Sequence, residues 1–593
     1  KRTQHAGTSP ENRPAELAST RLAPEKNHTL SPGKAVTFWS NGLYIRGELL
    51  TMKPILTFLC CLLLLTAFAS AEVKQPNVVL IFADDMGYGD VTSYNAKSKI
   101  HTPNLDRLAK GGMRFTDAHS ASAVCTPSRY ALLTGRYSWR TGLKSGVLGG
   151  FSQPLIEKGR RTLAHLFQDK GYRTACIGKW HLGMDWAGGM RGEKGYSMRN
   201  NSKGIDFTKP IQNTATVNGF DEFFGIAASL DMPPYVFIRN DRVTEQPTSS
   251  LKEEDKGGRQ GPAVPGWRHK HVMPTFTDEV ISFIQRNRQS PFFVYMPLNA
   301  PHTPHAPGDA FVGKSKLDIY GDFMVEVDHH IGRVMDELDR LKLSDNTLVI
   351  VTSDNGPETN MYPRRSKFGH DSSSHFLGAK RDNWEGGHRV PFIARWPGVI
   401  APGSKCDTPF CLVDMMATFA EIVSVELPED QGVDSVSILP LMQGKNGDYR
   451  GSHAIIHHSS SGRFAIRRGD WKLLLHAGSG GNGYGAGKRS SRYNGTIEQK
   501  SFKTANRQLY NMRTDPDETT NLIEKRPEVV SELTALAGEY VRKGRSTPGP
   551  RQKTVLQSWP QLDWLSLQQV PGTPGDASET NRATRKRKKV NSD

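Results

Sequence analysis

The sequence predicts an α/β protein in which a mixed, mostly parallel sheet lies between layers of helices, followed by a smaller α+β subdomain. Apolar, β-branched runs alternate with amphipathic helical segments from Gln75 to about Gly398. From about His453 the pattern changes to short strands, a glycine-rich loop and one final helix. The length of 593 residues exceeds what one core usually holds, which also favours a second, smaller unit.

The composition is that of a soluble globular protein, with 36% hydrophobic and 23% charged residues. Part of the net charge of +17 lies before residue 54 and in the segment from Asp576. The positive charge that remains on the rest of the chain suits an anionic substrate, but an excess of this size is also common among proteins in general. The basic end "RATRKRKKVNSD" is interpreted as a solvated, disordered tail, so no nucleic-acid partner is expected.

The first methionine, Met52, opens a stretch typical of secretory signals: one lysine, an apolar run, and Ala-Ser-Ala at 69–71. We therefore expect a signal peptide at 52–71 and interpret residues 1–51 as upstream sequence translated from a misplaced start. The alternative is a membrane anchor behind a cytoplasmic arm, but the apolar run is shorter than the roughly 20 residues that a bilayer needs. The prediction is a periplasmic or secreted protein without a stable membrane anchor.

Removal of that signal leaves four cysteines, which are too few for a disulfide framework in so long a chain. Cys406 and Cys411 are close enough in sequence to pair across a loop. Cys176 lies in the apolar stretch "TACIG" and is interpreted as a buried core residue. Cys125 stands apart, directly before "TPSRYALLTGR".

The elements follow one another in the order expected of a parallel sheet. A buried strand, "NVVLIFADD", precedes a helix, "TPNLDRLAKGG". Two helix-to-strand units come next, "RTLAHLFQDKGYRTACIG" and "FTDEVISFIQRNRQSPFFVYMPLNA". The long helix "DFMVEVDHHIGRVMDELDRLKL", whose His329 and His330 are interpreted as solvated or packed, leads into the strand "NTLVIVTSDNG".

The second unit contains strands around "RRGD" and the helix "RPEVVSELTALAGEYVRKG". We expect a catalytic domain at 72–450, a subdomain at 451–545 and a disordered basic tail at 546–593.

Charged and polar residues that can bind ligands follow four of the predicted strands, at the sheet edge where α/β proteins bind ligands. Each alone has an ordinary structural interpretation, such as a turn or a helix cap. Together they supply carboxylate and amide oxygens, a set that suits Ca²⁺ or Mg²⁺ better than zinc, beside cationic donors suited to a tetrahedral anion. The residues are Asp84, Asp85, Lys179, His181, His302, Asp354 and Asn355.

Cys125 is predicted at a helix N-terminus, because Pro127 suits the first helical position and Gly135 the end. Free backbone N–H groups there favour anionic ligands. A thiol in this place could be a nucleophile of lowered pKa. A soft thiolate beside a hard-oxygen metal site is nevertheless a poor chemical match, and an oxygen would serve better.

The stretch "CTPSRYALLTGR" strongly resembles the signature of the type I sulfatases, in which a separate maturation enzyme oxidises the cysteine to Cα-formylglycine. Further blocks resemble that family in its order: "IFADDMGYGD", "GKWHLG", "APHTPH", "TSDNG", "GAKRDNWEGGHRVPFIARWPG" and "LYNMRTDPDETTNL". The resemblance implies an alkaline-phosphatase-like fold and hydrolysis of sulfate monoesters. It also implies one calcium ion held by Asp84, Asp85, Asp354, Asn355 and the modified Cys125.

The same resemblance implies the catalytic roles. The hydrated aldehyde at Cys125, held by Arg129, attacks sulfur with one hydroxyl, and Asp354 is the expected base. His181 then takes a proton from the second hydroxyl, so that sulfate leaves and the aldehyde returns.

Sulfate binding and leaving-group protonation fall to other residues of the resembling blocks. Lys179 and Lys380 bind sulfate oxygens, although Arg381 is an alternative to Lys380. His302 with Lys380 protonates the leaving oxygen. Trp384 and His388 either line the leaving-group pocket or belong to a surface loop.

The predicted activity is that of an arylsulfatase-type sulfuric ester hydrolase, acting on aryl sulfates in vitro and on sulfated carbohydrates in nature. Two alternatives stay open. One is a phosphomonoester or phosphonate hydrolase on the same scaffold. The other is a sulfated-glycan binding protein whose Cys125 stays a thiol.

Overall fold

The structure is a computed structural model that describes residues 75–189, 202–251, 258–445, 453–482, 506–552 and 560–565. The expected upstream segment 1–51 and signal peptide 52–71 lie outside these residues, as does most of the expected tail. No helix in the described ranges is both long enough and apolar enough to cross a membrane.

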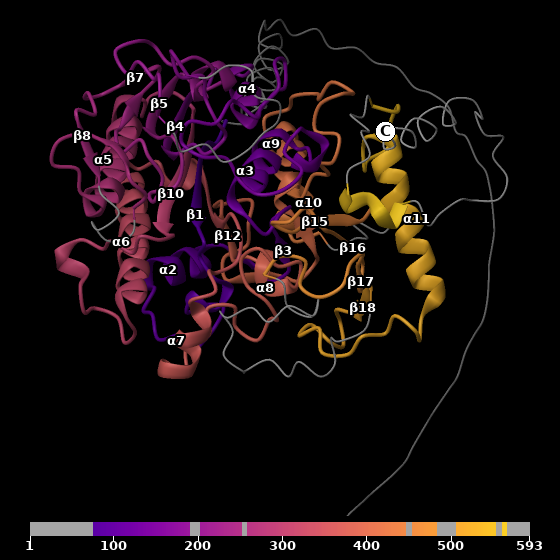
Figure 1. Ribbon diagram of the computed structural model, residues 1–593. Coiled ribbons are helices and arrows are strands. Elements are labelled where there is room, and N and C mark those ends of the chain that lie inside the picture. Colours follow the sequence, from indigo (N-terminus) through magenta and orange to yellow (C-terminus); the bar gives the residue numbers. More distant parts are fainter. Residues whose placement is uncertain are drawn as a thin grey trace, which may run out of the picture. The chain divides into compact units, whose positions relative to one another are not determined.

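A mixed ten-stranded sheet forms the centre of the fold, as predicted (Figure 1). Its central strands β11, β1, β10, β4 and β5 run parallel, and β12 joins β11 antiparallel. In spatial order the sheet contains β13 (Ser404–Cys406), β2 (Met113–Phe115), β12 (Phe392–Arg395), β11 (Thr347–Ser353), β1 (Asn77–Asp84), β10 (Phe292–Pro301), β4 (Arg173–Lys179), β5 (Glu222–Ile226), β6 (Ile238–Arg239) and β7 (Arg242–Val243).

Helices cover both faces of this sheet, which explains why β1 is apolar between Asn77 and Asp84 and is buried along its whole length. Val78 and Leu80 pack into one core with α3, α4 and α9, whereas Val79 and Ile81 pack into another with α2, α5 and α6. The helices are α2 (Pro103–Gly111), α3 (Cys125–Thr134), α4 (Leu163–Gln168), α5 (Val272–Arg286), α6 (Ile319–Arg340), α7 (Met361–Phe368), α8 (Glu385–His388), α9 (Met415–Ile422) and α10 (Leu439–Met442).

The helix that follows the cysteine motif begins earlier than predicted. Cys125 is the first residue of α3, so Pro127 occupies the third helical position rather than the first. The proline is still tolerated because the N–H groups of the first turn have no intrahelical partner. Gly135 ends the helix in a left-handed conformation, with φ of 63°, as expected.

A second, antiparallel sheet of four strands carries the C-terminal part of the chain. Helix α11 (Pro527–Lys543) packs on it, and Gly544 closes that helix with φ of 75°. The strands are β15 (Ile455–His458), β16 (Phe464–Arg468), β17 (Trp471–Leu474) and β18 (Gln508–Asn511). Two small pairs complete the described strands, β3 (Ala118–His119) with β14 (Phe410–Cys411) and β8 (Ser249–Leu251) with β9 (Gly261–Ala263).

The C-terminal sheet is bonded to the segments around the cysteine motif. The Ala123 N–H donates to the carbonyl of His458 at 3.0 Å, and the Arg381 N–H donates to Ala123 at 2.7 Å. Residues 560–565 form a short 3-10 helix whose Leu562 and Trp564 are buried in the same core as α11. This packed segment differs from the disordered tail expected from residue 546, and apolar burial explains the difference.

No disulfide joins the cysteines of the described residues. Cys406 lies in β13 and Cys411 in β14, which belong to different sheets. Cys176 is buried in β4, as predicted. His330 is buried in α6 and His329 is exposed beside it, which matches the packed-or-solvated interpretation.

Candidate active site

Two adjacent parallel strands deliver the predicted oxygen ligands to one place. β1 and β11 pair in register and end at the same sheet edge, so Asp84 and Asp85 meet Asp354 and Asn355. The backbone N–H of Asp85 donates to Asp354 Oδ1 at 3.2 Å, and Asn355 Nδ2 donates to Asp85 Oδ1 at 2.7 Å. All four side chains are buried.

The backbone turns sharply at this edge. Asp85 has φ of 67° and His181 has φ of 55°, a left-handed conformation that is uncommon for residues other than glycine. The turn at Asp85 lets two consecutive carboxylates serve one site, where Asp84 meets Lys179 and Asp85 meets Lys380.

Three cations surround the carboxylates. Lys179 Nζ lies 2.6 Å from Asp84 Oδ2, and Lys380 Nζ lies 2.7 Å from the Asp85 carboxylate. Arg129 Nη2, one turn into α3, lies 2.7 Å from Asp354 Oδ2 and 3.5 Å from Asp84 Oδ1. We call these six residues the cage: Asp84, Asp85, Arg129, Lys179, Asp354 and Lys380.

The charges of the cage shift its pKa values in opposite directions. Burial alone would raise the pKa of Asp84, but Lys179, His302 and Arg129 outweigh it and hold that pKa well below the usual range. Burial and the neighbouring charge of Asp84 raise the pKa of Asp354 to about 6, against the opposing effect of Arg129.

Cys125 lies against the cage at the start of α3. Its Sγ is 3.5 Å from Asp84 Oδ1, and one ligand atom each from Asp84, Asp85, Cys125 and His302 falls within 4.8 Å of the others. Burial raises the pKa of the Cys125 thiol despite the nearby Lys179 and Lys380. Burial therefore does not favour a direct thiolate nucleophile at an unmodified Cys125.

His302 and His181 each have one ring nitrogen at hydrogen-bond distance from a backbone carbonyl. His302 Nδ1 lies 2.6 Å from the carbonyl of Thr303, and its Nε2 lies 3.8 Å from Asp85 Oδ2. His181 Nε2 lies 2.8 Å from the carbonyl of Leu148, while its Nδ1 has no hydrogen-bond partner in the described part of the chain. Since a carbonyl only accepts, His181 Nδ1 carries a lone pair that can take a proton.

The donor set fits a hard divalent cation. Asn355 Nδ2 donates to Asp85 and Gly356, which fixes the orientation of the side-chain amide. Its Oδ1 is buried and has no hydrogen-bond partner among the described residues. A buried carbonyl oxygen without a donor, next to three carboxylates, is the arrangement expected of a calcium or magnesium ligand set.

The structure separates Lys380 from its neighbour Arg381. Lys380 contacts Asp85, whereas Arg381 donates through both terminal nitrogens to Glu358 at 2.6 Å. Sequence reasoning missed Glu358, whose one signal is its place three residues after Asn355 in "DNGPE".

Trp384 and His388 follow neither earlier interpretation, because both are fully buried. Trp384 packs with Leu474 and Tyr510 of the C-terminal sheet. His388 belongs to a second charged group beneath α8, which we call the α8 cluster and which the sequence did not predict. Its ion-pairing members are Asp117, Glu385, Arg389, Arg467, Lys472 and Glu518.

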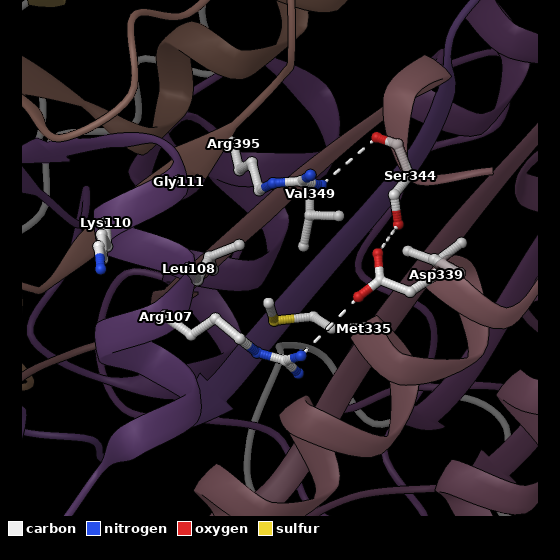
Figure 2. A pocket seen from close by; sticks show the side chains of 10 residues that line it. Arg107, Leu108, Lys110, Gly111, Met335, Asp339, Ser344, Val349 and Arg395 are labelled. Carbon is white, nitrogen blue, oxygen red and sulfur yellow. Dashed lines mark hydrogen bonds and ion pairs between the residues drawn. The ribbon is translucent and has the colours of Figure 1, made fainter. Parts of the chain in front are cut away.

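A cavity of about 390 Å³ lies elsewhere, between α2, α6 and the beginning of β11 (Figure 2). Arg107 of its wall pairs with Asp339, and Arg395 donates to the carbonyl of Ser344. None of the predicted catalytic residues lines it.

The fold and the cage together define a hydrolase of anionic esters on an α/β scaffold. The family model described as Sulfatase matches residues 76–425, and the chain belongs to that family. Its members hydrolyse sulfuric esters, and this chain is an enzyme of that class.

Several characterised relatives share most of the chain. It is 33% identical over 503 residues to an N-acetylgalactosamine-6-O-sulfatase of Bacteroides thetaiotaomicron, covering 78% of this chain and 92% of that protein. It is 33% identical over 479 residues to human arylsulfatase A, covering 78% and 86%. A solved Bacteroides thetaiotaomicron sulfatase, described in work on the metabolism of multiple glycosaminoglycans, is 32% identical with a TM-score of 0.66, covering 78% and 98%. These matches confirm the predicted family and fold.

Proposed function

We propose that this protein is an exported sulfatase that uses a formylglycine at position 125 and one calcium ion. The observation that carries the proposal is the position of Cys125 Sγ, 3.5 Å from Asp84 Oδ1 and beside a cage of carboxylates and cations. The oxygens of Asp84, Asp85, Asp354 and Asn355, together with the modified residue, would hold the ion. When hydrated, the aldehyde supplies one hydroxyl to attack sulfur and a second whose deprotonation releases sulfate.

The residues of the chain then have distinct tasks. Arg129 fixes the modified residue from inside α3, because its guanidinium is always charged and fully buried. Lys179 and Lys380 bind sulfate oxygens and balance their charge. Both ammonium groups contact carboxylates of the cage, which orients them toward the space in front of Cys125.

Proton transfer falls to His302, His181 and Asp354. His302 is the general acid for the leaving oxygen, since it is the more exposed of the two histidines and its Nδ1 is oriented by Thr303. His181 is the base for the hydroxyl that releases sulfate, through the unpartnered Nδ1. Asp354 is the base for the attacking hydroxyl.

The substrate we propose is a sulfated saccharide. The match to this chain covers 92% of a relative whose name is N-acetylgalactosamine-6-O-sulfatase. We also propose the signal peptide at 52–71, a periplasmic or secreted location, maturation by a formylglycine-generating enzyme, and the domain bounds 72–450 and 451–545.

The test is turnover of 4-nitrophenyl sulfate and 4-nitrophenyl phosphate by protein matured with a formylglycine-generating enzyme. We expect the sulfate to be hydrolysed faster. Faster turnover of the phosphate would favour the phosphohydrolase alternative. No turnover of either by aldehyde-containing protein would contradict the proposal.

A further inference from the structure

Side-chain exposure rises outward from the cage along one path. Asp85 and Lys380 are 3% and 5% exposed and His302 is 10% exposed, but Glu358 is 19% and Arg381 is 30% exposed. Arg381 directly follows Lys380, and the nearby charges of Glu358, Asp85 and Asp382 raise its pKa. The Arg381–Glu358 pair is therefore the more solvent-exposed group beside Lys380 and the cage.

The backbone of Arg381 is fixed on several sides. Its N–H donates to Ala123 at 2.7 Å, two residues before Cys125, and its carbonyl accepts from Ser460 at 3.1 Å. A Cβ at Gly481 would come within 1.9 Å of that carbonyl, so a third loop is pressed against it. Arg381 also has φ of 85°, a left-handed conformation that residues other than glycine rarely adopt.

The side chains of the pair keep hydrogen-bonding capacity toward solvent. Glu358 Oε1 already accepts from Arg381 and from the N–H and hydroxyl of Thr359, whereas Oε2 accepts from Arg381 alone among the described residues. The guanidinium uses one N–H of each terminal nitrogen on Glu358, and its other N–H groups have no partner in the described ranges.

A rigid, electrically neutral pair of this kind presents donors and an acceptor side by side. A second anion would be repelled by Glu358 as much as it is attracted by Arg381. A hydroxyl group, which both donates and accepts, fits better. Two neighbouring hydroxyls of a sugar ring can accept from Arg381 and donate to Glu358 at the same time.

We propose that the Arg381–Glu358 pair recognises hydroxyl groups of the saccharide next to the sulfate ester and thereby selects sulfated sugars over aryl sulfates. This inference rests on the proposed sulfatase function and adds a specificity role outside the cage. Neither residue takes part in the bond-breaking steps.

The test is a variant that removes both charges together, Arg381→Gln with Glu358→Gln, so that the net charge beside Lys380 does not change. The matched control is Arg239→Gln with Glu279→Gln, a partly exposed ion pair between β6 and α5. kcat and KM are measured on N-acetylgalactosamine 6-sulfate, its 4-deoxy analogue and 4-nitrophenyl sulfate.

We expect kcat/KM on the sulfated sugar to fall roughly 10- to 100-fold, mainly through KM, while aryl sulfate changes by less than about threefold. The variant should also discriminate less against the deoxy analogue, and the control should match wild type on all substrates. An equal loss on sugar and aryl sulfate, or no loss on the sugar, would overturn the inference. So would a wild-type enzyme that hydrolyses aryl sulfate but not the sugar. Failure of the proposed function itself would differ, because matured wild type would then hydrolyse none of them.

Discussion

The cage and the α8 cluster are built from the same kinds of residue. Each contains three carboxylates and three cations, buried and in direct contact. Each also offers a group of side chains that could hold a metal ion, with His119, His388 and His457 in the second case. Residue type and burial alone therefore do not tell which of the two is the active site.

Access separates the two regions. Beside the cage, side-chain exposure rises from His302 to Arg381, whereas Glu385, Lys472 and Glu518 of the α8 cluster are fully buried. Unpartnered atoms occur in both regions, since Asn355 Oδ1 and both nitrogens of His457 have no hydrogen-bond partner among the described residues. Because Glu385, Lys472 and Glu518 are fully buried, the α8 cluster is better explained as a structural link between the two sheets.

The α8 cluster satisfies its own charges. Asp117 contacts Arg467 at 2.7 Å and Arg389 at 3.3 Å, and Lys472 lies 2.8 Å from both Glu385 and Glu518. Asp117 directly precedes β3, Glu385 lies in α8, and Arg467 and Lys472 lie in β16 and β17, so the cluster joins the C-terminal sheet to the segment that follows Lys380. Its integrity should matter for stability and only indirectly for chemistry.

The largest effect is expected in the cage. Asp84→Ala or Asn355→Ala should lower kcat/KM by at least roughly 10³-fold and remove bound calcium, because each takes away a proposed ligand. Calcium content by elemental analysis and Tm by calorimetry would be measured together. Wild-type activity and calcium content in Asp84→Ala would show that the ligands are assigned wrongly.

Breaking the α8 cluster should act on stability instead. Lys472→Met leaves Glu385 and Glu518 buried beside each other, and should cost about 3–5 kcal/mol of unfolding free energy. Calcium binding per folded molecule should persist. The matched Lys405→Met variant changes an exposed lysine and should unfold like wild type. Loss of calcium without loss of stability in Lys472→Met would show that the α8 cluster contributes to the metal site and is not a separate structural region.

His302→Ala should distinguish leaving groups. Its proton matters for a sugar alkoxide and little for 4-nitrophenolate, so kcat on a sulfated sugar should fall by about 10²–10⁴ and much less on the aryl sulfate. Steady-state kinetics on both substrates would show this difference. An equal loss on the two substrates would assign His302 to sulfate binding instead.

The smallest effect is expected at His457, whose ring stacks on His388 at 3.8 Å. His457→Phe keeps an aromatic ring at this position and removes the two nitrogens that have no hydrogen-bond partner among the described residues. The free energy of unfolding should therefore change by less than about 1 kcal/mol, and the metal content should not change. Loss of a bound transition metal in this variant would identify the histidine group as a second metal site.

The sequence predicted the cage because its members end strands or lie in short local motifs. Parallel strands place such ends together, so Asp84 and Asp354 could be joined without a structure. The start of α3 was missed by two residues, because a proline is tolerated anywhere in the first helical turn. The α8 cluster could not be predicted: Asp117 and Arg467 are far apart in sequence, and Asp117 follows β2, a strand of three residues that is too short to show in the sequence pattern. The same holds for Glu358, whose role depends on its contact with Arg381.

The central claim is that residue 125 is a formylglycine and is the nucleophile. Mass spectrometry of the tryptic peptide 115–129, with activity measured on the same sample, tests it most directly. Conversion of –CH₂SH to –CHO should make the peptide about 18 Da lighter than the thiol form, reactive to hydrazides but not to iodoacetamide. Activity should rise in proportion to the aldehyde fraction, and Cys125→Ala should be inactive while folded. Full activity in a sample whose residue 125 is entirely thiol would contradict the account and favour a thiolate nucleophile.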